Sequence, residues 1–472
     1  MKNLDFKALE QFLGHFWDKE ILPTLMKYVA IPCESPAFDK AWAENGHMEA
    51  AACLARDWVE AQQIPGCRVE LLREGRRTPL LLAEIDGEPG PTVLIYGHLD
   101  KQPPMTGWRE GLGAWNPVLD AEGRLYGRGG ADDGYSVFAA VAAIKALKEL
   151  RLPHSRMVLL IECSEESGSP DLPAYLKKEA RRIGEVDFVV ALDSGCGNYD
   201  QLWSTTSLRG LLEITLQVDV LAEGVHSGIA GGITPSPLTV ARILLDRLED
   251  SATGKVLVPE LFCEIPPGRV KQAETAAKVL GGDIVAQFPF LEGVRPISDD
   301  HTELLLNNAW RPALAITAQE GLPEWGKGGN VVHPALKLAL SFRIPPGVKP
   351  TAAGTAVRKV LERDPPYGAK VTVSTGGMEG WDAPPLADWL AAATKSASLE
   401  VFGKGACYFG LGGTIPFMQM IGEQFPQAQF LITGVLGPHS NAHGPNEFLH
   451  IPYAKRLNAS LTSVLAAHQY RP

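Results

Sequence analysis

Short apolar segments alternate with segments of helical periodicity in the N-terminal part of the chain. Three buried strands are predicted at 92–96 (TVLIY), 157–163 (MVLLIEC) and 186–193 (VDFVVALD), because these segments are rich in Val, Ile and Leu and lack polar alternation. Helices are predicted between them at 135–150 and 173–182. This order indicates an α/β fold with a mainly parallel sheet and helices on both faces.

A different pattern follows the third of these strands. Apolar and polar residues alternate over 212–220, 336–344 and 371–373, as in a sheet with one solvated face. Helices are predicted nearby at 238–249 and 351–363. These segments indicate a separate, smaller α/β domain with a one-sided sheet.

The uniformly apolar type of strand returns near the C-terminus. A helix is predicted at 385–402, an apolar strand at 430–435 and a final helix from about Tyr453. The Pro- and Gly-rich residues 250–334 carry no predicted elements. The simplest organisation is one large domain interrupted by a smaller one, with the segments 1–208 and 377–472 around 209–376.

Composition narrows the class of protein. The length of 472 residues favours two or three domains, and a net charge of -11 argues against nucleic acid or an anionic membrane as a partner. The N-terminus lacks the uninterrupted apolar core of a signal peptide, and no stretch approaches the length of a membrane span. Seven scattered cysteines without a C-x-x-C pair indicate a reduced, cytoplasmic protein.

Candidate chemistry lies where predicted strands end, the edge at which open α/β sheets bind ligands. Glu165 and Glu166 follow one strand and repel each other unless solvent, a base or a metal compensates them. His98 and Asp100 follow another and point the same way, so that the carboxylate can orient the imidazole. Taken singly, these residues could equally belong to solvated loops.

Further carboxylates and imidazoles strengthen the metal interpretation. Asp132 lies in GRGGADDG and Asp193 ends VVALD, although either could simply cap a helix or turn. The late loop GPHSNAHGPNEFLH offers His439, His443 and His450, and spacing alone does not choose among them. Together these residues form the ligand set that Zn²⁺ or Mn²⁺ prefers.

Two other enzyme classes are disfavoured by missing motifs. No G-x-S-x-G occurs, which argues against a serine hydrolase. The glycines at 127, 129 and 130 do not complete the G-x-G-x-x-G of a dinucleotide-binding redox enzyme.

Six segments, in order, resemble a known family. GHLDKQPP, LYGRGGADDG, CSEESGSPDL, ALDSG, VHSGIAGG and HGPNE are similar to the two-metal exopeptidases that include carnosinase, bacterial cytosolic dipeptidases, carboxypeptidase G and aminoacylase. The resemblance spans nearly the whole chain and is closest to the carnosinase-like dipeptidases. It implies that the inserted domain is a lid and dimerisation domain, and that the protein is a homodimer.

The resemblance also implies a role for each strand-end residue. Two divalent ions, Zn or Mn, would be bound, the first by His98 and Asp193 and the second by Glu166 and His443, with Asp132 bridging them. His443 is preferred over the other two histidines because it begins the family motif HGPNE. Glu165 would be the general base that activates a water molecule, and Asp100 would support His98.

Other implied residues lie in or beside the inserted domain. His226, in VHSGIAGG, resembles the residue that family dimers lend to the partner's active site to stabilise the oxyanion. Arg343 resembles the residue that binds the substrate's terminal carboxylate, and further substrate contacts are implied for Asn330, Gly413 and Thr414. The alternatives are that His226 is a histidine of a surface loop and that Arg343 is a solvated residue of the sheet. One departure is that Gly134 directly follows the Asp pair, where the family usually has Lys, which leaves fine substrate preference open.

These features predict metal-dependent hydrolysis of dipeptides or short peptides that have a free C-terminal carboxylate. Two alternatives remain open at this point, an N-acyl amino acid deacylase with the same centre and an inactive, metal-stabilised binding protein. The retained Glu165 argues against the binding protein, since binding alone does not need a general base.

Overall fold

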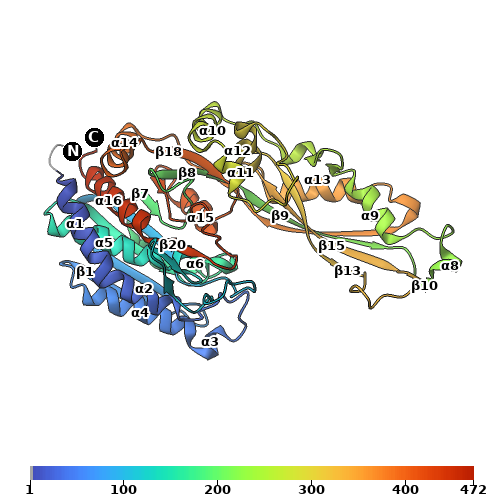
Figure 1. Cartoon of the computed structure of the whole chain (residues 1–472), viewed down its shortest axis with the longest axis horizontal. Helices are drawn as coiled ribbons and strands as arrows, with labels where there is room; N and C mark the ends of the chain where they lie inside the picture. The colour runs from blue at the N-terminus through green and yellow to red at the C-terminus, as the bar shows by residue number, and fades with distance from the viewer. Residues whose placement is uncertain (1–3, 472) are drawn as a thin grey trace. The chain divides into compact units, whose positions relative to one another are not determined.

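The computed structural model describes residues 4–471, which form two compact units. Unit 1 contains the chain up to Thr206, Ala383–Phe409 and the chain from Ile415 onward. Unit 2 contains Ser207–Asp382 and Gly410–Thr414. The chain therefore leaves unit 1, builds unit 2 and returns (Figure 1).

The larger sheet has nine strands and is parallel at its centre. Its four central strands run in the order β6 (Ser155–Glu162), β3 (Glu88–His98), β7 (Val186–Ala191) and β19 (Gln429–Ile432), and all their pairings are parallel. The flanking strands β1, β2 and β8 pair antiparallel. The bounds of the outer strands are Cys67–Leu72 (β1), Leu80–Ile85 (β2), Trp203–Leu208 (β8), Trp381–Asp382 (β17) and Cys407–Leu411 (β18). The α/β prediction is confirmed, with antiparallel edges that buried-strand patterns do not reveal.

Helices cover both faces of this sheet. A side chain at Gly97 on β3 would come within 2.1 Å of Ser136 Oγ, so this face lies against α5 (Tyr135–Glu149). The neighbouring Tyr96 points to the opposite face, where its ring stacks on Phe417 of α15 (Pro416–Gln424) at 3.6 Å. Because successive strand residues face opposite sides, α5 and α15 lie on opposite faces.

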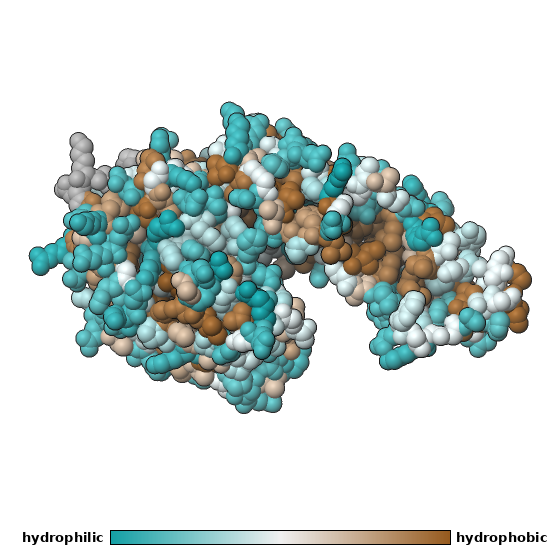
Figure 2. Space-filling model, viewed as in Figure 1, coloured by the Kyte–Doolittle hydropathy of each residue, from teal (hydrophilic) through white to brown (hydrophobic). Residues whose placement is uncertain are grey.

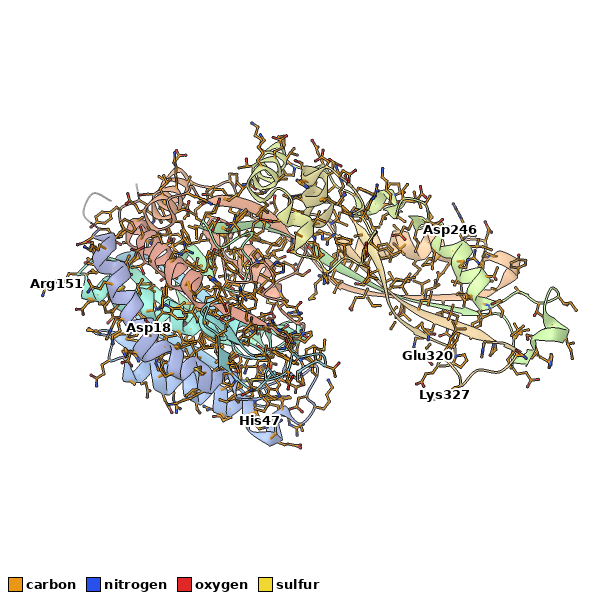
Figure 3. The ribbon with its side chains drawn as sticks, in the orientation of Figure 1. Asp18, His47, Arg151, Asp246, Glu320 and Lys327 are labelled. Atoms are coloured by element: carbon orange, nitrogen blue, oxygen red, sulfur yellow. The ribbon has the colours of Figure 1, made fainter. Side chains whose placement is uncertain are left out.

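The C-terminal helix α16 (Ile451–His468) is almost entirely buried. Its Asn458 accepts a hydrogen bond from Trp17 Nε1 at 2.9 Å and donates one to the carbonyl of Ala139 at 2.9 Å. Lys455 pairs at 2.6 Å with Asp18 of the segment η1 (Trp17–Ile21), and Figure 3 labels Asp18. The remaining helices of unit 1 are α1 (Phe6–Phe16), α2 (Leu22–Val29), α3 (Trp42–Asn45), α4 (His47–Ala61), α6 (Leu172–Lys178), α7 (Ala180–Ile183) and α14 (Asp388–Phe402).

Unit 2 contains a four-stranded antiparallel sheet in the order β13 (Ala313–Glu320), β15 (Ala335–Ile344), β9 (Gly210–Asp219) and β16 (Lys370–Met378). The alternating apolar residues of β9 and β15 form the core of this unit, beside α9 (Pro237–Leu245) and α13 (Pro350–Glu362). On the edge strand β13, Glu320, which Figure 3 labels, lies 3.6 Å from Lys337 of β15. One face of the sheet is thus buried and the other polar.

The segment 250–334, in which no elements are predicted, contains helices and strands. Its helices are α10 (Pro267–Leu280), α11 (Asp283–Ala286) and α12 (His301–Ala309). The short strands of unit 2 are β10 (Val225–His226), β11 (Glu249–Asp250), β12 (Lys255–Val256) and β14 (Val331–Val332). The two-residue strands are too short to show a hydrophobic period, and α10 and β13 have few buried residues, so neither has a clear period in the sequence.

Candidate metal centre

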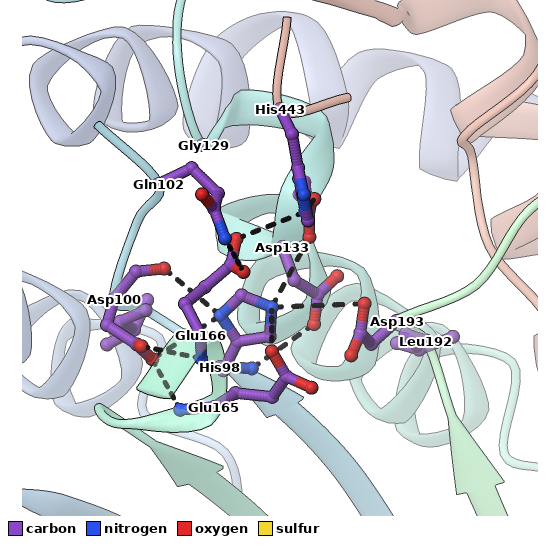
Figure 4. Close-up of polar contacts among 12 residues, drawn as sticks. His98, Asp100, Gln102, Gly129, Asp133, Glu165, Glu166, Leu192, Asp193 and His443 are labelled. Atoms are coloured by element: carbon purple, nitrogen blue, oxygen red, sulfur yellow. Dashed lines mark hydrogen bonds and ion pairs between the residues drawn. The ribbon is translucent and has the colours of Figure 1, made fainter. Parts of the chain in front are cut away.

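The strand-end residues of unit 1 converge at one edge of the sheet (Figure 4). His98 is the last residue of β3, Glu165 and Glu166 follow β6, and Asp193 follows β7. These strands are parallel and adjacent, so their carboxyl ends meet. The side chains that gather there are those of His98, Asp100, Asp132, Asp133, Glu165, Glu166, Asp193 and His443.

Asp132 lies between two pairs of candidate ligands. It belongs to the segment η2 (Gly130–Gly134) before α5, and its Oδ1 lies 3.4 Å from His98 Nε2. Its Oδ2 lies 3.0 Å from His443 Nε2. His443 Nε2 is 3.5 Å from Glu166 Oε1, and His98 Nε2 is 3.8 Å from Asp193 Oδ1. A carboxylate in this position has one oxygen for each pair.

Two orphaned atoms indicate that a cation fits here. His98 Nε2 and Glu166 Oε1 are buried, and neither forms a hydrogen bond within residues 4–471. Buried polar atoms are rarely left unpaired unless an ion or water completes them. Two groups of side chains are close enough to hold an ion, His98 with Asp132 and Glu166, and His98 with Asp133 and Asp193. Imidazole and carboxylate donors suit Zn²⁺ or Mn²⁺.

The electrostatics of the cluster agree with this fit. Burial raises the pKa of Glu166 to about 8, with a further contribution from the Asp132 carboxylate, and burial raises the pKa of Asp193 to about 6. Burial also favours a raised pKa for Asp132, but His443 and His98 hold the pKa of that carboxyl well below its usual range. The cluster therefore has more carboxylates than its imidazoles can balance, and divalent ions would supply the missing positive charge.

Asp100 links His98 to the loop that carries the paired glutamates. Its carboxylate accepts hydrogen bonds from the backbone N–H groups of Glu165 at 3.0 Å and Glu166 at 2.9 Å, and from Ser35 Oγ at 2.6 Å. His98 Nδ1 lies 3.1 Å from the backbone carbonyl of Asp100 and 3.5 Å from its carboxylate. The side chain of Asp100 thus holds the glutamate loop, and its backbone carbonyl is the closer partner of the imidazole.

Glu165 lies at the margin of the cluster. Its Oε2 is 4.0 Å from His98 Nε2, farther than the oxygens of Asp132 and Asp193. Burial, with a contribution from Asp193, raises the pKa of Glu165 well above its usual value. A carboxylate beside a metal centre, with a strong affinity for a proton, can act as an acid or a base.

The structure distinguishes the three histidines of the late loop. His443 joins the cluster, as described above. His450 instead stacks on Tyr199 at 4.3 Å and accepts a hydrogen bond from the N–H of Tyr453 at 3.1 Å. His439 forms no ion pair with these carboxylates within the part of the chain that the structure describes.

Sequence reasoning missed four residues around the cluster. Asp133 is fully buried, and its Oδ2 accepts a hydrogen bond from the backbone N–H of His98 at 3.2 Å. Gln102 donates to Glu166 Oε2 at 2.6 Å. Arg128 and Glu447 form a buried ion pair beside the cluster. All four lie within motifs that the sequence shows: Gln102 in GHLDKQPP, Arg128 and Asp133 in LYGRGGADDG, and Glu447 in HGPNE. Membership of a motif could have found them, but no role was assigned to them.

The predicted residues of the inserted domain lie in unit 2 and form two groups. Arg343 Nη1 donates to Thr414 Oγ1 at 3.2 Å, and the neighbouring Gly413 is exposed. His226 is exposed on β10, and the following Ser227 donates to the carbonyl of Asn330 at 2.8 Å. The structure thus brings Arg343 close to Thr414, and His226 close to Asn330.

The chain matches Peptidase family M20/M25/M40 over residues 94–467, and it belongs to this family. The protein is therefore a hydrolase of a metallopeptidase family. No helix within residues 4–471 is both long and apolar enough to cross a membrane.

Named relatives and solved structures agree with this family. The chain is 29% identical to a Beta-Ala-His dipeptidase from Homo sapiens over 95% of its length and 91% of the relative. It is 28% identical to a Cysteinylglycine-S-conjugate dipeptidase from Corynebacterium striatum over 77% of the chain and 80% of that relative. The solved structure of the di-peptidase Dug1p from Saccharomyces cerevisiae superposes with a TM-score of 0.81 at 21% identity, and 99% of each chain is covered. The last comparison supports the fold alone.

Proposed function

We propose that this protein is a two-metal dipeptidase that hydrolyses the peptide bond of dipeptides or short peptides with a free C-terminal carboxylate. The observation that carries the proposal is the position of Asp132, between His98 and His443, with Glu166 and Asp193 beyond them. His98 and Asp193 would hold one ion, Glu166 and His443 the other, and Asp132 would bridge them. Zn²⁺ and Mn²⁺ both suit these ligands.

The division of roles follows from the surroundings of each residue. Divalent ions, when bound, supply the Lewis acidity that polarises the scissile carbonyl and lowers the pKa of water. Glu165 takes a proton from the attacking water and returns it to the leaving amine. Asp100 keeps Glu165 in place through the hydrogen bond from its backbone N–H at 3.0 Å.

The substrate class is supported by the relatives. Those at 28–29% identity are named as dipeptidases, for β-Ala-His in one case and for cysteinylglycine conjugates in another. Arg343 supports a requirement for a free carboxylate, because a guanidinium binds a carboxylate through two parallel hydrogen bonds. Asn330, Gly413 and Thr414 would add further contacts to the substrate.

We also propose that unit 2 is a lid and dimerisation domain, and that His226 of one subunit stabilises the oxyanion in the active site of the other. Exposed apolar side chains near His226 support an interface: Ile229 is 75% exposed and Ile233 is 81% exposed. Figure 2 shows hydrophobic residues at the surface of the α8 (Ser227–Ala230) end of unit 2. A cytoplasmic location is proposed because all seven cysteines are free thiols.

A substrate panel tests the proposed function. Purified protein would be assayed on dipeptides, tripeptides and N-acyl amino acids, before and after chelation and with Zn²⁺ or Mn²⁺ restored. Metal-dependent cleavage of dipeptides is the expected result. Preferential cleavage of acyl amino acids would instead identify a deacylase, and bound metal without turnover would identify a binding protein.

A further inference from the structure

Arg209 is a buried arginine without an acidic partner. It lies between β8 and β9, only 7% of its surface is exposed, and no acidic group within residues 4–471 pairs with it. Its Nη1 donates to the carbonyls of Asn307 and Arg311, both at 3.3 Å, and its Nε is buried with no hydrogen-bond partner. A buried charge normally has a partner, because taking it out of water is costly. The orphaned Nε thus leaves one donor of a buried charge without an acceptor among the described residues.

A second arginine lies beside it in the same unit. Arg343 of β15 pairs with Leu211 across the sheet, and Arg209 precedes Leu211 by two residues, so strand alternation directs both arginines to one face. Thr414 joins them, since its Oγ1 donates to the Arg209 carbonyl at 2.6 Å and accepts from Arg343 Nη1 at 3.2 Å. Burial and, after it, the charge of Arg343 lower the pKa of Arg209 to about 10. Burial lowers the pKa of Arg343, and the charge of the Glu213 carboxylate opposes this shift.

The loop Gly410–Thr414 fits closely against the Arg209 guanidinium. A side chain at Gly412 would come within 2.8 Å of Arg209 Nη2 and within 2.9 Å of Asn308 Nδ2. Only glycine allows the loop to approach this closely. By contrast, the nearby Arg311 is satisfied, because it pairs with Glu303. Arg209 is thus enclosed, but it has no carboxylate partner of the kind that Glu303 provides for Arg311.

We propose that Arg209 and Arg343 together form a two-arginine site for a carboxylate, and that Arg209 is a specificity-determining residue for the free C-terminal carboxylate of the peptide. Two guanidinium groups offer more directed donors than one, so the carboxylate is held at both oxygens. This inference rests on the proposed dipeptidase function and names the group that its substrate must carry. In this proposal, the carboxylate of the bound substrate is the hydrogen-bond acceptor that Arg209 Nε lacks.

The first test compares a dipeptide with its C-terminal amide. For Arg209→Met, we expect kcat/KM on the free-carboxylate dipeptide to fall by about 10- to 100-fold, mostly through KM, while the slow hydrolysis of the amide is unchanged. Arg209→Lys should recover part of the loss, because it restores the charge without the planar fork. Arg311→Met is the matched control and should leave both substrates unaffected. An equal loss on both substrates, or no loss on either, would overturn the proposal.

The second test measures binding without turnover. Calorimetric titration of the protein with its metals would compare glycine with glycinamide, which lacks the carboxylate. Wild-type protein should prefer glycine, and Arg209→Met should lose that preference while its thermal unfolding midpoint stays close to wild type. Because this readout needs no hydrolysis, absence of peptidase activity would refute the dipeptidase function and leave the two-arginine site to be judged by binding. An equal affinity of wild-type protein for both compounds would refute the site itself.

Discussion

Arg128 Nη1 and Glu447 Oε2 lie 2.5 Å apart, and 1% and 0% of their side-chain surfaces are exposed. This ion pair also holds the backbone of the candidate metal centre. Arg128 donates to the carbonyls of Pro103, His443 and Gly444, and the other oxygen of Glu447 accepts from the N–H groups of Gly129 and Asp132. The pair therefore connects the loops that carry Asp132 and His443.

Replacement Glu447→Gln should weaken both the fold and the metal centre. It leaves the Arg128 charge buried without a partner, which costs about 3–5 kcal/mol of the free energy of unfolding. Metal affinity should fall by roughly 10- to 100-fold, as for other residues that orient ligands. Denaturant unfolding and metal titration would measure the two effects. Glu303→Gln, in the more exposed pair with Arg311, is the control and should cost less than about 1 kcal/mol.

Replacement Glu165→Gln should separate catalysis from metal binding. The amide cannot accept a proton, so kcat should fall by about 10²–10⁴-fold. Metal content, measured after dialysis, should remain that of wild type, because Glu165 lies beside the proposed ligands. A variant that loses its metals would make Glu165 a ligand, and one that keeps full activity would exclude it as the base.

Individual ligand replacements should change the metal stoichiometry in a defined pattern. Asp193→Ala and His443→Ala should each retain about one ion per subunit, since each removes a ligand from a different position of a two-metal site. Asp132→Ala should lose both ions, because its two oxygens face both pairs of ligands. Elemental analysis of dialysed protein gives the count. Similar losses in all three variants would argue against a bridging Asp132.

Complementation tests whether His226 acts in the partner's active site. Glu165→Gln and His226→Ala should each be nearly inactive alone. Co-expression should restore about one quarter of wild-type activity, since half of randomly paired dimers are mixed and each mixed dimer has one complete site. Activity no higher than the sum of the separate variants would place His226 in its own subunit's site or outside catalysis.

The ion pairs of Asp187 predict a stability that depends on pH. Asp187 contacts His468 Nε2 at 2.9 Å and Arg471 at 2.6 Å. Although burial favours a higher value, these two contacts hold the pKa of Asp187 below its usual range. The unfolded chain therefore binds the proton more tightly, so the contribution is complete above the unfolded pKa of about 4 and disappears as pH falls through the lower folded pKa.

Asp187→Asn should accordingly reduce the free energy of unfolding by about 1–2 kcal/mol at pH 7, and by progressively less below about pH 4. Urea unfolding of both proteins across this range measures the difference. The control Asp200→Asn removes an exposed pair with Lys404 and should change stability little at any pH. A difference that stays constant down to low pH would contradict the assignment.

Much of the fold and the candidate ligands could be predicted from local sequence. The apolar run before Glu165 and the alternation from Leu212 onward each report which faces of a strand are buried, and the structure has β6 and β9 there. Strand ends placed His98 and Asp193 at the same edge of the sheet, because parallel strands finish at one edge, and the family resemblance paired them. The antiparallel strands β1 and β2 were not predicted, since their pairing depends on where the chain turns back.

The sequence by itself determined the kinds of strand, the strand-end carboxylates and imidazoles, and hence the class of chemistry. Tertiary structure alone decided which distant groups meet. The motif HGPNE favoured His443 over His450, but only packing brings His443 to Asp132. Packing likewise pairs Arg128 with the distant Glu447 and buries Arg209 beside Arg343. The physical reason is that hydrophobic periodicity reports burial within a segment, whereas these contacts depend on how separate segments pack, which no local period records.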